Sequence, residues 1–151
     1  MDRDDFGVLL ARAYVAFVEE MRAELADAGY ANLHPSFGYV ARALADGGLT
    51  LRQLADRLQL TPQGALKIVD TLEADGYVRR TADASDGRAK QLRLTKRGES
   101  ALAAARHFHT RFEQALSRRT GRGQTAALRH VLEDIVKARE ASGHDAALRP
   151  V

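Results

Sequence analysis

Two side chains one helical turn apart, Gln63 and Lys67, carry hydrogen-bonding groups that could read the edge of another molecule. The Gln63 amide both donates and accepts, whereas the Lys67 ammonium only donates. These groups suit an adenine edge and the O6 and N7 acceptors of guanine, respectively, as a major groove presents them. Leu66 offers an apolar contact for a thymine methyl group, and Gly64 allows close backbone approach. Gln63, Gly64, Leu66 and Lys67 are therefore the candidate base-reading residues.

Basic side chains gather downstream of this segment. Residues 76–97 carry a net charge of +5, whereas residues 1–30 carry −4. A basic block of this density indicates a polyanionic partner, and the alternative is a solvated charged face. The side chains expected to contact phosphates are Arg52, Gln53, Thr61, Arg79, Arg80, Lys90 and Arg93.

The nine residues 82–90 are too many for a tight turn between two strands, so they predict a functional loop. Arg88 lies at the tip of this loop and could enter a minor groove, where narrow A·T tracts concentrate negative potential. Asp86 could orient Arg88, or another arginine of the loop, by a charge-assisted hydrogen bond. Asp86-Gly87 is equally good turn chemistry, and the two roles are compatible.

Two short helices must position these groups. Thr50 and Gln53 form a T-x-x-Q capping box that predicts a helix over residues 51–58. After the three-residue link 59–61, Thr61-Pro62 opens a second helix that Gly76 closes. Its expected inner face is Ala65, Ile68, Val69 and Leu72, which leaves Gln63 and Lys67 outside. An ordinary amphipathic helix would look similar, but the capped helix before it and the basic hairpin after it favour contact with DNA.

The remaining periodicity predicts strands over residues 77–81 and 91–94 and four further helices. Two of these helices lie before the short pair, at residues 6–28 and from near Pro35. The other two follow Thr95 and are separated at Gly121. The expected fold is mainly α with a small β-hairpin wing, a winged helix-turn-helix joined to a helical dimerisation lobe. We expect residues 30–100 to form the DNA-binding lobe, residues 1–29 and 101–141 the dimerisation lobe, and residues 142–151 a flexible tail.

These motifs together resemble the MarR family of bacterial regulators. Residues 50–58 (TLRQLADRL) are similar to the family's third helix, and residues 64–80 (GALKIVDTLEADGYVRR) to its recognition helix and first wing strand. The wing signature D-x-R, followed by L-T-x-x-G, is met by Asp86, Arg88, Leu94, Thr95 and Gly98. The recognition helix departs from the usual basic or hydroxyl-rich outer face because it begins Pro62-Gln63-Gly64. The operator sequence therefore cannot be taken from relatives.

The resemblance implies a homodimer in which the first, fifth and sixth helices of two chains interlock. The resemblance also implies that the protein is a sequence-specific regulator. It would act as a ligand-responsive repressor bound to a pseudo-palindromic operator in double-stranded DNA. Relatives also bind small aromatic effectors between their two lobes. The residues that could line such a pocket are Tyr14, Phe17, Tyr30, His34, Phe37 and Tyr39, unless they are core aromatics.

Other classes of protein fit the sequence less well. The absence of cysteine excludes disulfides and thiolate metal sites. His107 and His109 are splayed by about 200° on a helix, and no recognised ligand spacing occurs, so we expect no metal and no cofactor. No nucleophile–base pair or phosphate loop indicates an enzyme. The acidic start and the lack of a run of ~18 apolar residues predict a cytoplasmic protein with no membrane partner. The alternative function is a winged-helix protein–protein interaction module without DNA sequence specificity.

Overall fold

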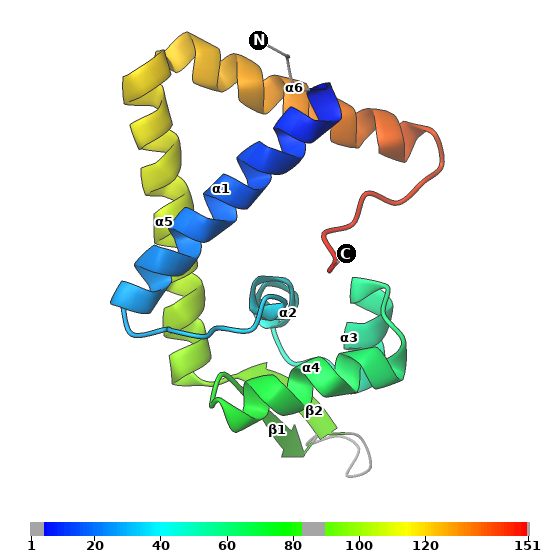
Figure 1. The fold of residues 1–151 in the computed structure, drawn as a ribbon. Helices are drawn as coiled ribbons and strands as arrows, with labels where there is room; N and C mark the ends of the chain where they lie inside the picture. Colours follow the sequence, from blue (N-terminus) through cyan, green and yellow to red (C-terminus); the bar gives the residue numbers. More distant parts are fainter. Residues whose placement is uncertain (1–4, 83–89, 151) are drawn as a thin grey trace. The chain divides into compact units, whose positions relative to one another are not determined.

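The computed structural model describes residues 5–82 and 90–150 and divides the chain into two compact units, Met1–Leu33 and His34–Val151. Each unit is described by itself. The elements follow in the order α1 (Phe6–Asp27), α2 (Phe37–Leu44), α3 (Leu51–Leu58), α4 (Pro62–Ala74), β1 (Val78–Ala82), β2 (Lys90–Leu94), α5 (Lys96–Thr120) and α6 (Arg122–Ala141) (Figure 1). This is the mainly helical fold with one β-hairpin that the sequence predicts.

The first unit is essentially α1. The helix ends one residue before the predicted boundary, and Gly29 follows it at a φ of +96°, a conformation that glycine adopts without strain. Leu25 is the buried residue of the helix, whereas Phe6, Leu10 and Tyr14 are exposed. Most of the apolar surface of α1 therefore faces solvent in the single chain.

Threonine side chains start three of the helices, as the sequence predicts. The Thr50 hydroxyl accepts a hydrogen bond from the Gln53 backbone N–H, and the Gln53 side chain accepts one from the Thr50 N–H, which completes the capping box. Thr61 and Thr95 accept from the N–H groups of Gly64 and Gly98, respectively. These bonds satisfy donors that a helix leaves unpaired in its first turn.

The start of α2 differs from the prediction. The helix begins at Phe37 rather than near Pro35, because Ser36 takes the N-cap position and Pro35 lies in the turn before it. The Ser36 N–H donates to Nδ1 of His34, and the Phe37 N–H donates to the His34 carbonyl. His34 therefore supports the turn that leads into α2.

The hairpin is antiparallel, with Val78 opposite Leu94 and Arg79 opposite Arg93. Leu49 extends this sheet by one isolated bridge, exchanging two backbone hydrogen bonds with Leu92. Val78, Leu92 and Leu94 are buried, whereas Arg79 and Arg93 are exposed. β2 therefore alternates between buried leucine and exposed arginine, so that one face of the hairpin covers the core while the other carries Arg79 and Arg93.

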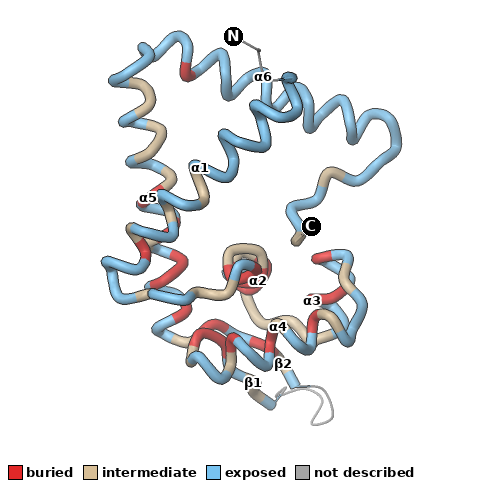
Figure 2. The backbone as a smooth tube through the Cα atoms, in the orientation of Figure 1, coloured by how far each residue is buried: buried red, intermediate tan, exposed pale blue. Residues whose placement is uncertain are grey.

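A single core underlies the second unit from α2 to the first half of α5. Its largest fully buried side chains include one each from α2, α3, α4, β2 and α5, namely Phe37, Leu54, Leu72, Leu92 and Phe108. Figure 2 shows the buried positions concentrated in α2, α3, α4, the hairpin and the lower half of α5. This core fixes α4 and the hairpin relative to each other.

The junction between β2 and α5 is very tight. The Thr95 hydroxyl donates to the Gly76 carbonyl at 2.6 Å, and the Thr95 N–H donates to the Tyr77 carbonyl at 3.1 Å. A Cβ atom at Gly98 would lie 2.1 Å from that same Tyr77 oxygen, so no other residue fits there without a backbone shift. This contact is the physical reason for the L-T-x-x-G motif in this chain.

The C-terminal part of the chain is mostly solvent-exposed. Along α6 only Thr125 is buried, and Leu128, Val131, Leu132, Ile135 and Val136 are all exposed. Residues 144–150 form no helix or strand, but Asp145 and Arg149 both hydrogen-bond the Gln59 side chain. No helix in the described ranges is long and apolar enough to cross a membrane.

Candidate nucleic-acid interface

The predicted base-reading residues lie on the outer face of α4. Gln63 and Lys67 are exposed, and Leu66 is 38% exposed despite being apolar. On the opposite face Ala65, Val69 and Leu72 are buried, while Ile68, predicted with them, is only half-buried. The helix thus stands on the core with a polar surface free to meet a partner. The contacts of Gln63, Leu66 and Lys67 with bases remain a prediction.

Gly64 has a second, local reason to be glycine. Its N–H donates to the Thr61 hydroxyl at 3.0 Å, and a Cβ atom there would lie 3.1 Å from that oxygen. The absence of a side chain at Gly64 therefore leaves room for the Thr61 hydroxyl at the start of α4 and keeps the outer side of the helix open. Thr61 itself is exposed, with its hydroxyl already used in the cap.

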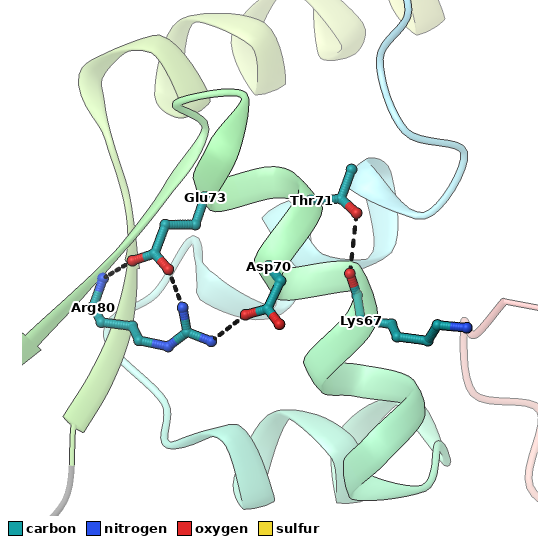
Figure 3. A network of polar contacts seen from close by, with 5 residues as sticks. All are labelled: Lys67, Asp70, Thr71, Glu73 and Arg80. Atoms are coloured by element: carbon teal, nitrogen blue, oxygen red, sulfur yellow. Dashed lines mark hydrogen bonds and ion pairs between the residues drawn. The ribbon is translucent and has the colours of Figure 1, made fainter.

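Arg80 is held by two acids of α4. Its guanidinium donates to Asp70 at 2.7 Å and to Glu73, and its backbone N–H donates to Glu73 at 3.3 Å (Figure 3). The hydrogen bond with Asp70 raises the pKa of Arg80 further. This network ties the recognition helix to β1. It gives Arg80 a structural role in addition to the phosphate contact expected from its charge.

The sequence reasoning missed this network. Helical periodicity places Asp70 on the flank of α4 and assigns no partner to Glu73. Spacings of seven and ten residues to Arg80 cross the turn between a helix and a strand, where helical periodicity no longer applies. The signal that could have indicated this network was the presence of two acidic residues on α4 shortly before a strand with two arginines.

The other expected phosphate contacts are spread over α3 and the hairpin. Arg52 and Gln53 are exposed in the first turn of α3, and Gln53 also serves the cap. Lys90 is exposed at the start of β2. Arg79 and Arg93 face each other across the hairpin on the side away from the core, and Arg93 donates to the Gln91 side chain at 3.1 Å. Like charges directly opposite destabilise a hairpin slightly, which suits a site for an anion.

The wing residues Asp86 and Arg88 lie outside the described residues. Their predicted roles therefore rest on the sequence alone. In the sequence they lie between Ala82, the last residue of β1, and Lys90, the first residue of β2.

The six aromatic and histidine residues predicted to line an effector pocket fall in both units. Tyr14, Phe17 and Tyr30 belong to the first, whereas His34, Phe37 and Tyr39 belong to the second. Phe37 is a core residue, buried and packed against the Tyr77 ring at 5.3 Å. His34 supports the turn before α2. The effector prediction gains no support from these placements and stays a prediction.

A half-buried arginine–histidine pair in the second unit was not predicted. Arg42 of α2 lies 3.1 Å from Nε2 of His109 on α5 and also donates to the Gly38 carbonyl. Burial and the neighbouring Arg42 lower the pKa of His109. The neutral imidazole can therefore accept from Arg42. Among the described residues no group of three or more histidines and acids could hold a metal ion.

Comparison with known proteins agrees with this geometry. Residues 32–89 match the family model described as "MarR family". A curated relative, the exopolysaccharide II synthesis transcriptional activator ExpG of Rhizobium meliloti (strain 1021), is 28% identical over 109 residues. The match covers 72% of this chain, which spans only 56% of that protein's length.

Solved structures match over most of the chain. The transcriptional repressor CouR, bound to a 23-mer DNA duplex, is 29% identical with a TM-score of 0.67, over 87% of this chain and 92% of that one. A single-residue mutant of S. aureus MepR, bound to an oligodeoxyribonucleotide, is 20% identical with a TM-score of 0.62, over 90% and 99%. The predicted resemblance is confirmed, because residues 32–89 match the MarR family model and the described part of the chain has the fold of these winged-helix structures.

Proposed function

We propose that this chain is a sequence-specific DNA-binding transcriptional regulator. The observation that carries the proposal is the outer face of α4, where Gln63 and Lys67 are exposed above a buried apolar face. The relatives CouR and MepR, each described as bound to DNA, support the same use of the shared fold. Gln63, Gly64, Leu66 and Lys67 would read bases, and Arg88 would enter the minor groove.

The functional unit we propose is a homodimer. Leu128, Val131, Leu132, Ile135 and Val136 recur at three- and four-residue spacing along α6, and all are more than 40% exposed. A continuous apolar stripe of this kind is normally covered by a partner. Two-fold symmetry would set two recognition helices about 34–36 Å apart on a pseudo-palindromic operator. In this arrangement residues 1–29 and 101–141 form the dimerisation lobe and residues 30–100 the DNA-binding lobe.

We further propose that the regulator represses. CouR, described as a repressor, matches 87% of this chain, whereas the activator ExpG matches 72%. Repression requires an operator that overlaps the promoter. Deleting the protein should therefore raise transcription from the promoter that its operator overlaps. Release from DNA by a small aromatic effector is the finer part of this proposal, and a thermal-shift screen with aromatic acids tests it.

Selection of bound fragments from random DNA, followed by sequencing, tests the central proposal. A pseudo-palindromic consensus is expected, with affinity that falls steeply with salt because phosphate contacts release counterions. Gln63→Ala should relax base preference at one position of each half-site, at a cost of about 1–3 kcal/mol for the preferred base. Arg88→Ala should weaken binding to every sequence. Arg118→Ala removes an exposed arginine near the end of α5 and is the matched control, which should leave DNA affinity unchanged.

The competing function is a protein–protein interaction module. It would show no enriched DNA sequence and no salt-dependent binding to DNA. Equal DNA affinity for Gln63→Ala, Arg88→Ala and the Arg118→Ala control would likewise contradict the proposed docking of α4 and the wing. A wild-type protein that selects one consensus would exclude the interaction module as the main role, provided that Gln63→Ala relaxes the base preference and Arg88→Ala weakens binding.

A further inference from the structure

The segment that follows α6, residues 144–150, leaves the helix in a defined direction. Gly143 has a φ of +78°, and its N–H donates to the Glu140 carbonyl at 3.0 Å. The His144 N–H donates to the Arg139 carbonyl at 3.4 Å. These two bonds form a Schellman motif, in which a glycine in the left-handed conformation ends a helix and redirects the chain. The helix end therefore sets the course of this C-terminal segment.

The C-terminal segment holds both sides of one side-chain amide. The Gln59 amide N–H donates to the Asp145 carboxylate, and the Gln59 side-chain carbonyl accepts a hydrogen bond from the Arg149 guanidinium. Asp145 also accepts from the Ala147 N–H at 2.8 Å, which folds the segment between its two contacts. Each contact with Gln59 joins a charged group to a neutral one, and such bonds are stronger than those between two neutral groups.

Gln59 lies in the turn of the helix-turn-helix. It ends α3 in the left-handed conformation, with a φ of 54° and a ψ of 41°, and two residues later the Thr61 hydroxyl caps α4. Amide side chains and helix N-termini are among the groups with which proteins contact DNA phosphates. Thr61 and Gln63 are also residues of the proposed DNA surface. The Asp145 carboxylate is thus bound to a hydrogen-bond donor beside the DNA contacts that we propose.

We propose that residues 144–150 form an autoinhibitory latch, in which the Asp145 carboxylate takes a hydrogen-bond donor that a DNA phosphate would otherwise use. This inference rests on the proposed function, because the latch regulates the same DNA surface. Arg149 is the second anchor of the latch. DNA can displace the segment because Gln59, Asp145 and Arg149 are all exposed, so that water already competes for their hydrogen bonds.

Two point variants of the full chain separate the latch from simple electrostatics, with a DNA fragment selected by the wild-type protein as the probe. Arg149→Ala removes a cation, which by charge alone should weaken DNA binding. Release of the latch should instead tighten binding by about two- to tenfold, the range that one net hydrogen bond is worth. Asp145→Ala should tighten binding by a similar factor.

Two matched controls accompany these variants. Leu148→Ala changes a side chain between the two anchors that is 59% exposed. Asp134→Ala removes the same charge as Asp145→Ala, but from an exposed position on α6. Both controls should leave the DNA affinity unchanged. Asp145 and Arg149 are exposed and lie outside every helix and strand, so their variants should keep the fold.

Hydrogen exchange measures the latch by a readout other than affinity. Adding DNA to the wild-type protein should speed exchange of the backbone amides in residues 144–149, because the segment is displaced. In Gln59→Ala the segment has lost its anchor, so its exchange should already be fast without DNA and should not change when DNA is added.

The latch is overturned if Arg149→Ala fails to tighten DNA binding, or if Asp145→Ala binds no more tightly than Asp134→Ala. It is also overturned if DNA slows exchange in residues 144–149, since the segment would then be part of the DNA surface. Any of these results with a wild-type protein that still selects a consensus would refute the latch alone. If neither the wild-type protein nor Arg149→Ala bound DNA, the proposed function would fail and the latch with it.

Discussion

The cored region from Phe37 to His109 and helix α6 differ in where they place their large apolar side chains. In the cored region apolar side chains are buried within one chain, and Leu54 is 0% exposed. On α6 a stripe of equally large side chains remains exposed, with Leu132 at 41% and Ile135 at 45%. Figure 2 shows this contrast along α5, which is buried at its start and exposed where it leads into α6.

The difference indicates two separate sources of stability. The cored region should hold its shape in an isolated chain, because its hydrophobic contacts are internal. In the proposed homodimer a second chain covers the apolar stripe of α6, so the contribution of this helix to stability should depend on protein concentration. Matched substitutions, one in each region, can break or sharpen this comparison.

Leucine truncation should give the largest effect. Leu54→Ala leaves a cavity in the core and should lower the free energy of unfolding by about 3–5 kcal/mol in urea melts. Leu132→Ala should instead weaken dimerisation, as measured by sedimentation, and its cost in stability should shrink as the protein is diluted and the wild-type dimer dissociates. Equal, concentration-independent losses in both variants would show that α6 belongs to the intramolecular core.

Adding one methyl group at a glycine should give the next largest effect. Gly98→Ala places a Cβ atom against the Tyr77 carbonyl and should destabilise the protein by about 2–3 kcal/mol. Gly123→Ala on α6 meets no atom within 4 Å and should leave the unfolding midpoint unchanged or raised. A tolerated Gly98→Ala would contradict the tight junction between the hairpin and α5.

Removing one arginine from an ion pair should have a smaller effect. Arg80→Gln breaks the bonds to Asp70 and Glu73 and should cost about 1 kcal/mol, since Arg80 and Glu73 are half-buried but Asp70 is exposed. Arg129→Gln removes the fully exposed pair with Glu113 and should leave thermal stability unchanged. If the two variants melted alike, the network in Figure 3 would have no role in fixing α4 to the hairpin.

The smallest expected effect is a dependence of stability on pH. Burial and Arg42 lower the pKa of His109 below its ordinary value of 6.5, so the unfolded chain binds its proton more readily than the folded chain. Stability should therefore fall as the pH drops below about 6.5, until the folded histidine is also protonated. His109→Gln keeps an acceptor for Arg42 and should reduce the difference in melting temperature between pH 7.5 and about 5.5. His130→Gln, on exposed α6, should melt like wild type, and an equal change in both variants would argue against His109 as the titrating group.

Much of the winged region could be predicted from sequence because its signals are local. Thr50, Thr61 and Thr95 each cap a helix within three residues, so the start of each helix is encoded beside it. The alternation in β2 likewise identifies which side chains face the core. The predicted start of α2 was two residues too early. Ser36, whose N–H donates to the His34 side chain, takes the N-cap position, so the helix begins after it rather than at Pro35.

The parts that could not be predicted depend on residues distant in sequence. The sequence predicted only a phosphate contact for Arg80, because its bonds to Asp70 and Glu73 depend on the angle between α4 and β1. One pocket is lined by Arg79, Arg93 and Arg106, which come from β1, β2 and α5, and no sequence spacing relates them. Charge could indicate a polyanion, but only the fold separates arginines on one side of the hairpin from the reading face of α4.

The tight junction at Thr95 and Gly98 also has a mechanical consequence. Because hydrogen bonds join the start of α5 to Gly76 and Tyr77 without an intervening loop, the hairpin and the helix should move as one rigid lever. The 25 residues of α5 give that lever a length of about 37 Å. A tilt of only about 5° at the α6 end would then displace the far end by about 3 Å, comparable to a base-pair rise. In the proposed dimer on DNA, a small change where the two chains meet would thus be enough to take the hairpin out of register with its groove.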